Sequence, residues 1–262
     1  MMRPMQTLTL FVHHDPSGKV KRHVLEYIRE LQRISDTVVV LSSTASEQSQ
    51  VRLVQEGIAI WKTDNTGYDI GKWRDYLCNH SITKVQRLIL ANDSCLLFRP
   101  LAPVMEVMGP HADVWGLSMS HEKAKHLQSN FLVFQSVQSR ATLVSFLSNQ
   151  APATSREDLV NRLEIGLSQH LMAKGLQLEA LITPPESFTG NITIHEWERL
   201  IRGFFHKSVY PLLKLKNLTT HKDLYPELCI NRMRQVITEE LALPGISASD
   251  LLSDLPLTNH ST

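Results

Sequence analysis

The chain has 262 residues, with 27 lysines and arginines against 26 aspartates and glutamates, for a formal net charge of +1. That length provides for one or two domains with a buried core. The balanced charge argues against duplex nucleic acid as a partner, because such binding depends on an excess of basic residues. No apolar run approaches the roughly 18 residues that a membrane-spanning helix needs. The first 15 residues hold only a short apolar run, so we expect no secretory signal and a cytoplasmic protein.

Strand-like and helix-like patterns alternate through the first 120 residues. The predicted strands are Leu8–His13, Thr37–Leu41, Ile58–Trp61 and Arg87–Ala91, and the predicted helices between them are Lys19–Ile34, Glu47–Glu56 and Ile70–Asn79. Such an alternation is typical of a parallel sheet with helices on both faces. We therefore expect an α/β fold built on an open, mostly parallel sheet.

The pattern is less regular in the rest of the chain. It predicts a short helix Val104–Met108, strands Asp113–Leu117 and Asn130–Phe134, a long helix Arg156–Lys174 with leucines every four residues, and a strand Leu176–Ile182. From Ile194 the sequence favours interrupted helices, of which Leu224–Leu243 is the last long one. The tail Ser247–Thr262 is expected to fray. This divides the chain into a core over residues 1–190 and a helical extension over residues 191–262.

Several common α/β active-site motifs are absent from the sequence. His13-His14-Asp15-Pro16 follows the first strand where a dinucleotide fold would carry G-x-G-x-x-G. There is no Walker A motif and no G-x-S-x-G elbow. The segment from His195 to Arg199 begins like a zinc-protease helix but lacks the second histidine. Three cysteines without a C-x-x-C pair favour free thiols over a disulfide framework.

The strongest local signal is Asn92-Asp93-Ser94, directly after an apolar strand. Ligands of open α/β sheets bind at the carboxyl ends of the strands. A carboxylate at that edge, here Asp93, can hold Mg²⁺ or Mn²⁺, which in turn neutralises a diphosphate. The alternative is a plain turn, because asparagine and aspartate both favour turns.

A second signal lies between the third strand and the helix that follows it. Asn65, Gly67, Tyr68, Asp69 and Lys72 stand at this boundary, where backbone N–H groups at a helix start suit an anion. The glycine permits close approach of a ligand, and the lysine supplies a compact charge for phosphate. The alternative is an ordinary capped helix start in which the aspartate interacts with the helix dipole.

The remaining candidates are single residues. Glu164 lies about 100° from Leu163, at the edge of the apolar face of its helix, where a partly desolvated carboxylate can act as a general base. The alternative is a solvated surface glutamate. His13 and Asp15 follow the first strand and are candidates for a nucleotide pocket. His126 and Gln128 are candidates for contacts with a sugar hydroxyl. The alternative for each is a turn or loop residue.

In their order, these segments resemble nucleotide-sugar glycosyltransferases of the GT-A fold, similar to the family-2 enzymes. They most resemble the rhamnan-synthesis protein F family, over residues 8 to 215. The segments that carry the resemblance are Asn65–Trp73, Asn92-Asp93-Ser94, Trp115-Gly116-Leu117, His126–Phe134 and Glu164–Ser168. The chain departs from the family-2 pattern at Ser42 and Ser43, which replace an aspartate. Its metal triplet has one carboxylate, and His195 or His206 is a candidate for a further ligand.

The resemblance implies a GT-A-like, Rossmann-type fold and an inverting transfer of a deoxyhexose. The sugar it implies is L-rhamnose from dTDP-rhamnose, and the acceptor is a surface polysaccharide or O-antigen, as a glycan or lipid-linked glycan at the inner face of the cytoplasmic membrane. It implies peripheral membrane association and no nucleic acid. A non-catalytic nucleotide- or glycan-binding subunit of a polysaccharide assembly complex is the alternative.

The roles that follow from the resemblance are specific. Asp93 holds the divalent metal, Glu164 deprotonates the acceptor, and His126 assists at the reacting sugar. The residues that bind the nucleotide sugar are His13, Asp15, Asn65, Gly67, Tyr68, Asp69, Lys72, Asn92 and Gln128.

Overall fold

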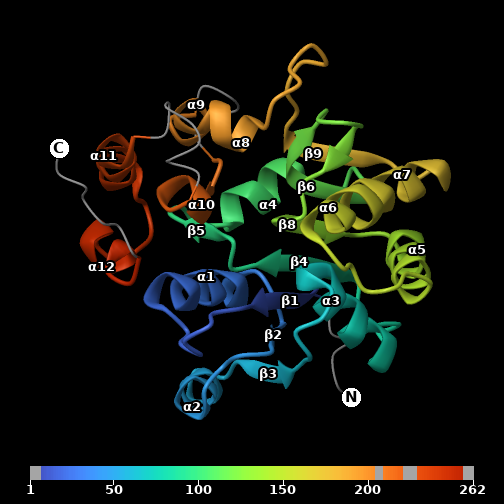
Figure 1. The fold of residues 1–262 in the computed structure, drawn as a ribbon, viewed down its shortest axis with the longest axis horizontal. Helices are drawn as coiled ribbons and strands as arrows, with labels where there is room; N and C mark the ends of the chain where they lie inside the picture. The colour runs from blue at the N-terminus through green and yellow to red at the C-terminus, as the bar shows by residue number, and fades with distance from the viewer. Residues whose placement is uncertain (1–6, 204–208, 221–228, 256–262) are drawn as a thin grey trace.

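The centre of the molecule is an eight-stranded sheet in the order β3-β2-β1-β4-β8-β6-β7, with β9 beside β6 (Figure 1). This computed structural model describes residues 7–203, 209–220 and 229–255. The strands are β1 (Thr7–His13), β2 (Thr37–Ser42), β3 (Ala59–Lys62), β4 (Arg87–Asn92), β6 (Val114–Ser120), β7 (His126–Leu127), β8 (Phe131–Phe134) and β9 (Leu178–Ile182). Only β8 and β7 pair antiparallel to their neighbours, so the predicted mostly parallel sheet is confirmed.

Helices cover both faces of the sheet. The first face carries α1 (Arg22–Arg33), α2 (Glu47–Gln55) and α4 (Ala102–Met108), and the second carries α3 (Tyr68–Asn79), α5 (Val137–Ser148) and α7 (Gly166–Ala173). In β1, Phe11 packs toward the first face, whereas Leu10 and Val12 pack toward the second. Burial on both faces explains why the parallel strands are continuous apolar runs rather than alternating ones.

Helix α5 was not indicated by the sequence pattern. Its apolar side chains are spread around the helix rather than gathered in one stripe. Ser136 caps it, with its side chain accepting a hydrogen bond from the N–H of Ser139 at 3.0 Å. The sequence pattern of a helix is an apolar stripe along one face, so a helix whose apolar side chains are spread around it is not detected.

The long helix predicted over Arg156–Lys174 is interrupted by a wider turn. It consists of α6 (Arg156–Asp158), the π-helical segment η1 (Leu159–Ile165) and α7. Leucines four residues apart drift by about 40° per step on a regular α-helix. The π-helical segment holds more residues per turn and takes up this drift. Leu163, Leu167 and Leu171 therefore stay on one buried face.

The sequence favours only helices from Ile194 on. The structure shows that the extension also contains a strand. It contains α8 (Ile192–His195), α9 (Trp197–Ile201), α10 (Leu215–Leu218), α11 (Ile230–Glu240) and α12 (Ala248–Leu252), and also the strand β10 (Leu212–Lys214). Strand β10 pairs antiparallel with β5 (Cys95–Leu97), which the sequence pattern also missed. Three-residue strands are too short to show a period, and only their long-range partner defines them. Residues 224–228 of the predicted Leu224–Leu243 helix lie outside the described residues.

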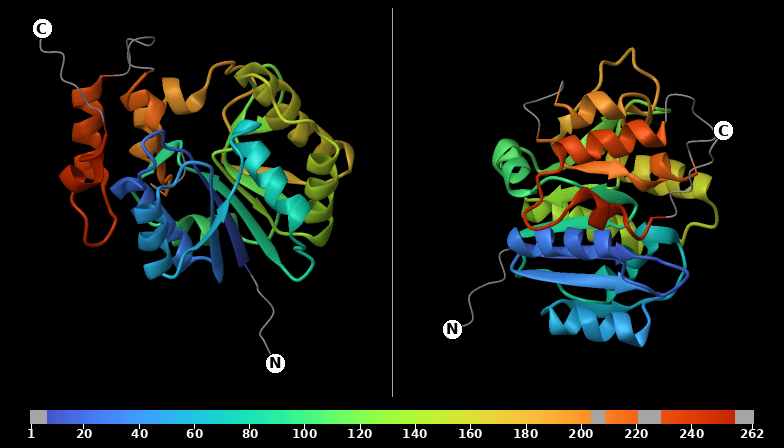
Figure 2. Two further views of the ribbon diagram at one scale, coloured as in Figure 1. Left: turned by 60° about the horizontal axis from the view of Figure 1, so that its bottom comes forward. Right: turned by 90° about the vertical axis from the view of Figure 1, so that its left-hand side faces the viewer.

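The expected fraying of the tail is wrong for residues 247 to 255. Ser247 and Asp250 form a reciprocal capping box at the start of α12. Leu251 is fully buried in the same hydrophobic cluster as α1, and Asp254 accepts a hydrogen bond from the N–H of Arg22 at 2.7 Å. Figure 2 shows α12 beside α1. In the described part of the chain, no helix has the length and apolarity needed to span a membrane.

Shortening Leu251 should test how firmly α12 is attached. We expect Leu251→Ala to lower the free energy of unfolding by about 2–5 kcal/mol, because it leaves a cavity in the core. Urea denaturation of the whole chain measures this loss. Leu252→Ala, on the half-buried neighbour, is the matched control and should cost less. Equal losses for the two variants would contradict the observed packing.

Candidate active site

The site begins where β1 and β4 end. These strands are parallel neighbours in the sheet, so the residues that follow them meet at one edge. Asp93 donates its backbone N–H to the Val12 carbonyl at 3.1 Å, and its Oδ2 accepts the N–H of His14 at 2.7 Å. The Asp93 carboxylate is thus fixed over the end of β1.

A second carboxylate lies close to Asp93. Asn92 donates from Nδ2 to Oδ2 of Asp69 at 3.0 Å, and its own Oδ1 accepts the N–H of Ser94 at 3.1 Å. Asn92 therefore closes the turn after β4 and holds Asp69 at the same time. The sequence analysis predicted that Asn92 binds a ligand. In the structure, its side-chain NH₂ and its side-chain oxygen both bond to groups of the protein.

The two carboxylates repel each other in a partly desolvated place. Burial and, next, the charge of Asp69 raise the pKa of Asp93 to about 7, against the pull of the His14 N–H and of Lys72. Burial also raises the pKa of Asp69, although the charges of Lys72 and Arg156 favour its ionised form. Such a pair of perturbed acids at a sheet edge is typical of a functional site.

Lys72 supplies a buried positive charge beside this pair. Its side chain is 2% exposed, and its Nζ donates to Oδ1 of Asn65 at 3.2 Å. Burial lowers the pKa of Lys72, whereas the charges of Asp69 and Asp93 raise it. An isolated buried ammonium is costly, so the two carboxylates and the lysine depend on one another.

The loop before α3 has an unusual backbone. Gly67 has φ +70° and Tyr68 has φ +57°, a left-handed conformation that is rare for a bulky residue. A Cβ on Gly71 would stand 2.2 Å from the Thr66 carbonyl oxygen. Gly71 is therefore required by the fold of the loop itself and not by the approach of a ligand. Strain of this kind is often retained at binding sites.

This loop lines a cavity of about 590 Å³ at the sheet edge. Tyr68, 43% exposed, presents a ring to this cavity, and His14 lines it from the end of β1. The other lining residues are Asn65, Thr66, Gly67, Asp69, Lys72, Pro152, Ala153 and Thr154. The volume suits a small-molecule ligand. His14 is a lining residue that the sequence analysis did not single out.

His13 and Asp15, predicted as nucleotide-binding, are not among the residues that line this cavity. His13 is fully buried, with Nδ1 3.0 Å from the Ser42 hydroxyl and Nε2 3.2 Å from the Lys19 carbonyl oxygen. Asp15 pairs with Lys21 at 2.7 Å. Burial would raise the pKa of Asp15, but Lys21 and the hydrogen bonds from Ser17 together outweigh burial and lower the pKa to about 2. The contacts of both side chains therefore hold the loop that follows β1 in place.

A second cavity, of about 610 Å³, holds Glu164, His126 and Gln128. Its other lining residues are Glu122, Lys123, Arg156, Glu157, Val160, Gly190, Asn191, Ile194, His195 and Lys214. The charges of Arg156 and Glu164 both act on Asp69, which lines the first cavity. Two residues of the second cavity are therefore close enough to Asp69, on the wall of the first cavity, for their charges to act on it.

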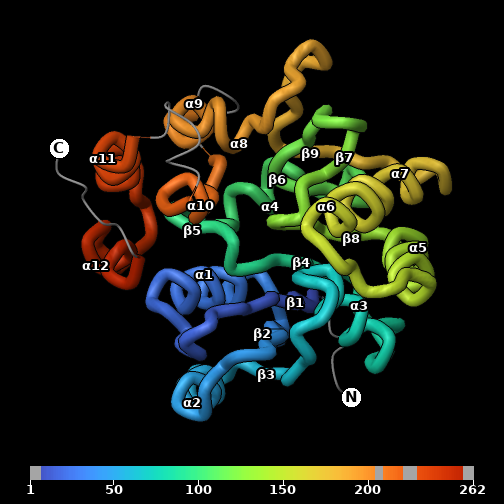
Figure 3. The backbone as a smooth tube through the Cα atoms, in the orientation of Figure 1, coloured from blue at the N-terminus to red at the C-terminus, as the bar shows by residue number. Residues whose placement is uncertain are grey.

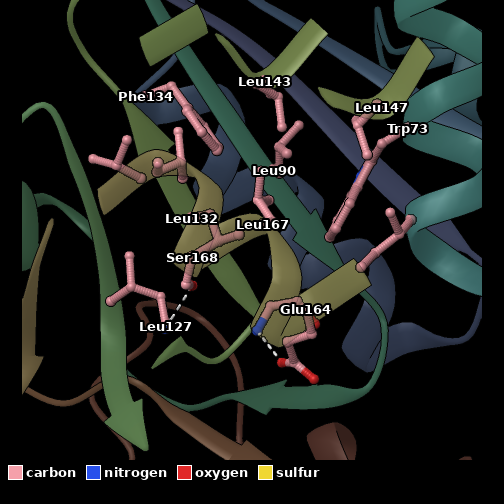
Figure 4. Close-up of a pocket in the computed structure, with 14 residues that line it drawn as sticks. Trp73, Leu90, Leu127, Leu132, Phe134, Leu143, Leu147, Glu164, Leu167 and Ser168 are labelled. Carbon is pink, nitrogen blue, oxygen red and sulfur yellow. Dashed lines mark hydrogen bonds between the residues drawn. The ribbon is translucent and has the colours of Figure 1, made fainter. Parts of the chain in front are cut away.

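Glu164 lies in the π-helical segment at the edge of apolar packing. Figure 4 shows its carboxylate directed away from the labelled leucines. Those side chains leave a void of only about 10 Å³, too small for a ligand. Oε1 of Glu164 accepts the N–H of Ser129 at 2.6 Å, which fixes the carboxylate. π-Helical turns are frequent at functional sites.

His126 lies in β7 and Gln128 follows this strand directly; Figure 3 traces β7 beside β6. Nδ1 of His126 lies 2.8 Å from the Ala124 carbonyl oxygen, so it carries the proton and leaves Nε2 as an acceptor. Gln128 accepts from the Ser118 hydroxyl at 2.6 Å and donates to Oδ1 of Asn191 at 3.3 Å. Gln128 thus positions Asn191 on the cavity wall.

Comparison with known proteins identifies the family. Residues 37–240 match the family described as rhamnan synthesis protein F. The chain belongs to this family. No curated protein sequence matches it.

Several solved structures are similar to this chain at low sequence identity. A Desulfovibrio desulfuricans protein assigned as a nucleotide-diphospho-sugar transferase is 12% identical, with a TM-score of 0.45 over 89% of this chain and 97% of its own. The 4-diphosphocytidyl-2C-methyl-D-erythritol synthase of Anaerococcus prevotii is 10% identical, with a TM-score of 0.43 over 72% and 92%. Glucosyl-3-phosphoglycerate synthase of Mycobacterium tuberculosis, solved with Mn²⁺ and UDP, is 9% identical, with a TM-score of 0.36 over 50% and 56%.

The donor set of this family member fits a divalent cation only together with a ligand. Within the described ranges, no group of three or more histidine, cysteine, aspartate or glutamate side chains is placed to hold a metal. The pair Asp69 and Asp93 offers hard oxygen donors, which Mg²⁺ commonly combines with substrate phosphates. His195 lies on the wall of the second cavity, and His206 lies outside the described residues.

The charge of Asp93 should make the protein less stable as the pH rises. The folded-state pKa of Asp93, about 7, lies above its ordinary value of 3.8. Between these two pH values the folded state keeps a proton that the unfolded state has lost, so stability falls with rising pH. Asp93→Asn keeps an acceptor for the His14 N–H but removes the charge. We expect its stability gain to be about 1–3 kcal/mol larger at pH 8 than at pH 5.

Urea denaturation at the two pH values measures this difference. Asp64→Asn is the control, because Asp64 is exposed in the same loop region and its substitution should change stability little at either pH. A gain for Asp93→Asn that is equal at pH 5 and pH 8 would show that the carboxylate is not electrostatically strained.

Proposed function

We propose that this protein is a glycosyltransferase that transfers a sugar from a nucleotide diphosphate donor to a glycan. The observation that carries the proposal is that Asp69 and buried Lys72 line one cavity and Glu164 lines a second, from which its charge acts on Asp69. Asn92 holds Asp69 beside the turn that carries Asp93. Membership in the rhamnan synthesis protein F family supports a polysaccharide product. The donor we propose is dTDP-L-rhamnose.

The first cavity is proposed to hold the nucleoside of the donor. The exposed ring of Tyr68 offers a stacking surface for a base, and Asn65 offers an amide to the base or ribose. Lys72, beside the carboxylates, faces the diphosphate as a compact charge. Mg²⁺ or Mn²⁺ held by Asp93 and Asp69 would neutralise charge on the diphosphate when bound.

The second cavity is proposed to hold the transferred sugar and the acceptor. Glu164 removes the proton from the acceptor hydroxyl, and the hydroxyl oxygen forms a bond to the anomeric carbon. The bond from that carbon to the diphosphate oxygen breaks, and its electron pair leaves with the nucleoside diphosphate. A single displacement of this kind inverts the anomeric configuration. His126, through Nε2, orients a sugar hydroxyl.

The acceptor we propose is a surface polysaccharide or O-antigen chain, as a free or lipid-linked glycan. A lipid-linked acceptor would bring the protein to the inner face of the cytoplasmic membrane. Separating these acceptors requires product analysis with both forms.

Donor binding can be tested by thermal shift. We expect one of dTDP, UDP and GDP, or one of their sugars, to raise the melting temperature of the wild type in the presence of Mn²⁺, because a ligand that binds only the folded state stabilises it. Asp93→Ala should reduce that shift. If no nucleotide shifts the melting temperature, the transferase proposal fails and a structural or glycan-binding role replaces it.

Catalysis can be tested at Glu164. Glu164→Gln retains an oxygen for the Ser129 N–H but cannot take a proton, so turnover should fall about 10²–10⁴-fold with little change in donor affinity. Glu106→Gln, on the exposed side of α4, is the matched control and should leave turnover unchanged.

The products of the same assay separate the rival functions. Near-normal turnover in Glu164→Gln would remove Glu164 from the mechanism. Release of free sugar without elongation of an acceptor would indicate a sugar-nucleotide hydrolase. Nucleotide binding without any turnover would favour the non-catalytic subunit of a polysaccharide assembly complex.

A further inference from the structure

The C-terminal extension is hydrogen-bonded to the turn that carries Asp93. In the β5–β10 pair, Lys214 stands opposite Cys95. The next residue, Leu215, donates its N–H to the Ser94 carbonyl at 2.9 Å. Because Ser94 follows Asp93 directly, the segment from Lys214 to Lys216 is held next to the carboxylate pair by main-chain bonds.

This segment brings two lysines to a third cation. Lys214 lines the second cavity together with Arg156, the first residue of α6. Burial lowers the pKa of half-buried Lys216, and the charges of Arg156 and then Lys214 lower it further, while Asp69 raises it. Arg156 and Lys214 are therefore close enough for their charges to act on Lys216, and the charge of Asp69 acts on it with the opposite sign.

None of these three cationic side chains has an acidic partner of its own among the residues that the structure describes. Arg156, Lys214 and Lys216 make no ion pair or hydrogen bond with any residue that the structure describes. Other arginines of the extension are well paired: Arg202, for example, contacts Glu198 at 2.9 Å and Glu239 at 2.6 Å. Lys214 and Lys216 are half-buried, whereas Arg156 is exposed, and a bound anion would favour the charged forms of the two half-buried lysines.

We propose that Arg156, Lys214 and Lys216 form a clamp for a diphosphate group, so that the C-terminal extension completes the binding site of the core. Arg156 and Lys214 line the cavity that holds Glu164, and the charge of Asp69, which lines the cavity assigned to the nucleoside, acts on Lys216. An arginine and two lysines match the charge and the several oxygens of a diphosphate. In assigning that diphosphate to the donor, the inference rests on the proposed function.

The clamp gives the extension a chemical role. When the bond to the anomeric carbon breaks, negative charge grows on the departing diphosphate. Fixed cations at that position stabilise the transition state more than the ground state. They share this task with Lys72, and they come from segments about 60 residues apart in sequence, Arg156 on one side and Lys214 and Lys216 on the other.

Calorimetric titration tests the clamp directly. The probes are inorganic pyrophosphate and dTDP, each titrated into the whole protein once with EDTA and once with Mg²⁺. We expect Lys214→Gln and Lys216→Gln each to weaken pyrophosphate binding about tenfold, and the double variant about a hundredfold, as charge-assisted hydrogen bonds are lost. Lys174→Gln, at the exposed end of α7, is the matched control and should bind both probes like the wild type.

The outcomes separate the clamp from the proposed function. Unchanged pyrophosphate affinity in the double variant, with its melting temperature preserved, would overturn the clamp even if dTDP binding still depends on Asp93. Pyrophosphate binding that the double variant loses, in a protein that binds no nucleotide, would support the clamp and contradict the donor.

A third probe identifies the source of the diphosphate. Geranyl diphosphate represents a lipid-linked acceptor, and dTDP represents the donor. Competition of dTDP with pyrophosphate, without competition by geranyl diphosphate, supports the donor assignment. The reverse result keeps the diphosphate clamp but overturns its assignment to the donor.

Discussion

The site depends on one constraint, the parallel pairing of β1 with β4. Parallel neighbours end at the same edge of a sheet, and the residue after β4 is Asp93, whose carboxylate accepts the N–H of His14 after β1. Asn92 then draws Asp69 from the start of α3 to the same place. Three elements far apart in sequence therefore deliver two carboxylates to one half-buried position, where their mutual repulsion has to be compensated.

Compensation comes from cations in three different parts of the fold. Lys72 lies one turn after Asp69 in α3, buried and charged because both carboxylates favour its ammonium form. Arg156 approaches from α6, and its charge acts on Asp69. Lys216 approaches from the extension. Glu164 adds a third negative charge that acts on Asp69, so acidic and basic groups are mixed at this edge, and a site of this kind gives up stability for function.

The sequence revealed those features that depend on local patterns. The strands around Leu8–His13 and Arg87–Ala91 were predictable because their burial on both faces leaves continuous apolar runs, and Asp93 stood out because a polar triplet follows such a run. The proximity of Asp69 to Asp93, by contrast, rests on a side-chain hydrogen bond across 23 residues. Lys214 and Lys216 were missed because β10 is only three residues long and is defined by its pairing with β5.

Glu164 shows how packing can place a reactive group without any local motif. Leu163 and Leu167 pack on the core on either side of Glu164, and the π-helical segment that contains Leu163 also sets the direction of the Glu164 side chain. The Ser129 N–H then fixes the carboxylate at 2.6 Å. The position of Glu164 is therefore determined by the leucines beneath it, so a change of leucine spacing would move the carboxylate relative to Asp69 even with every polar residue retained.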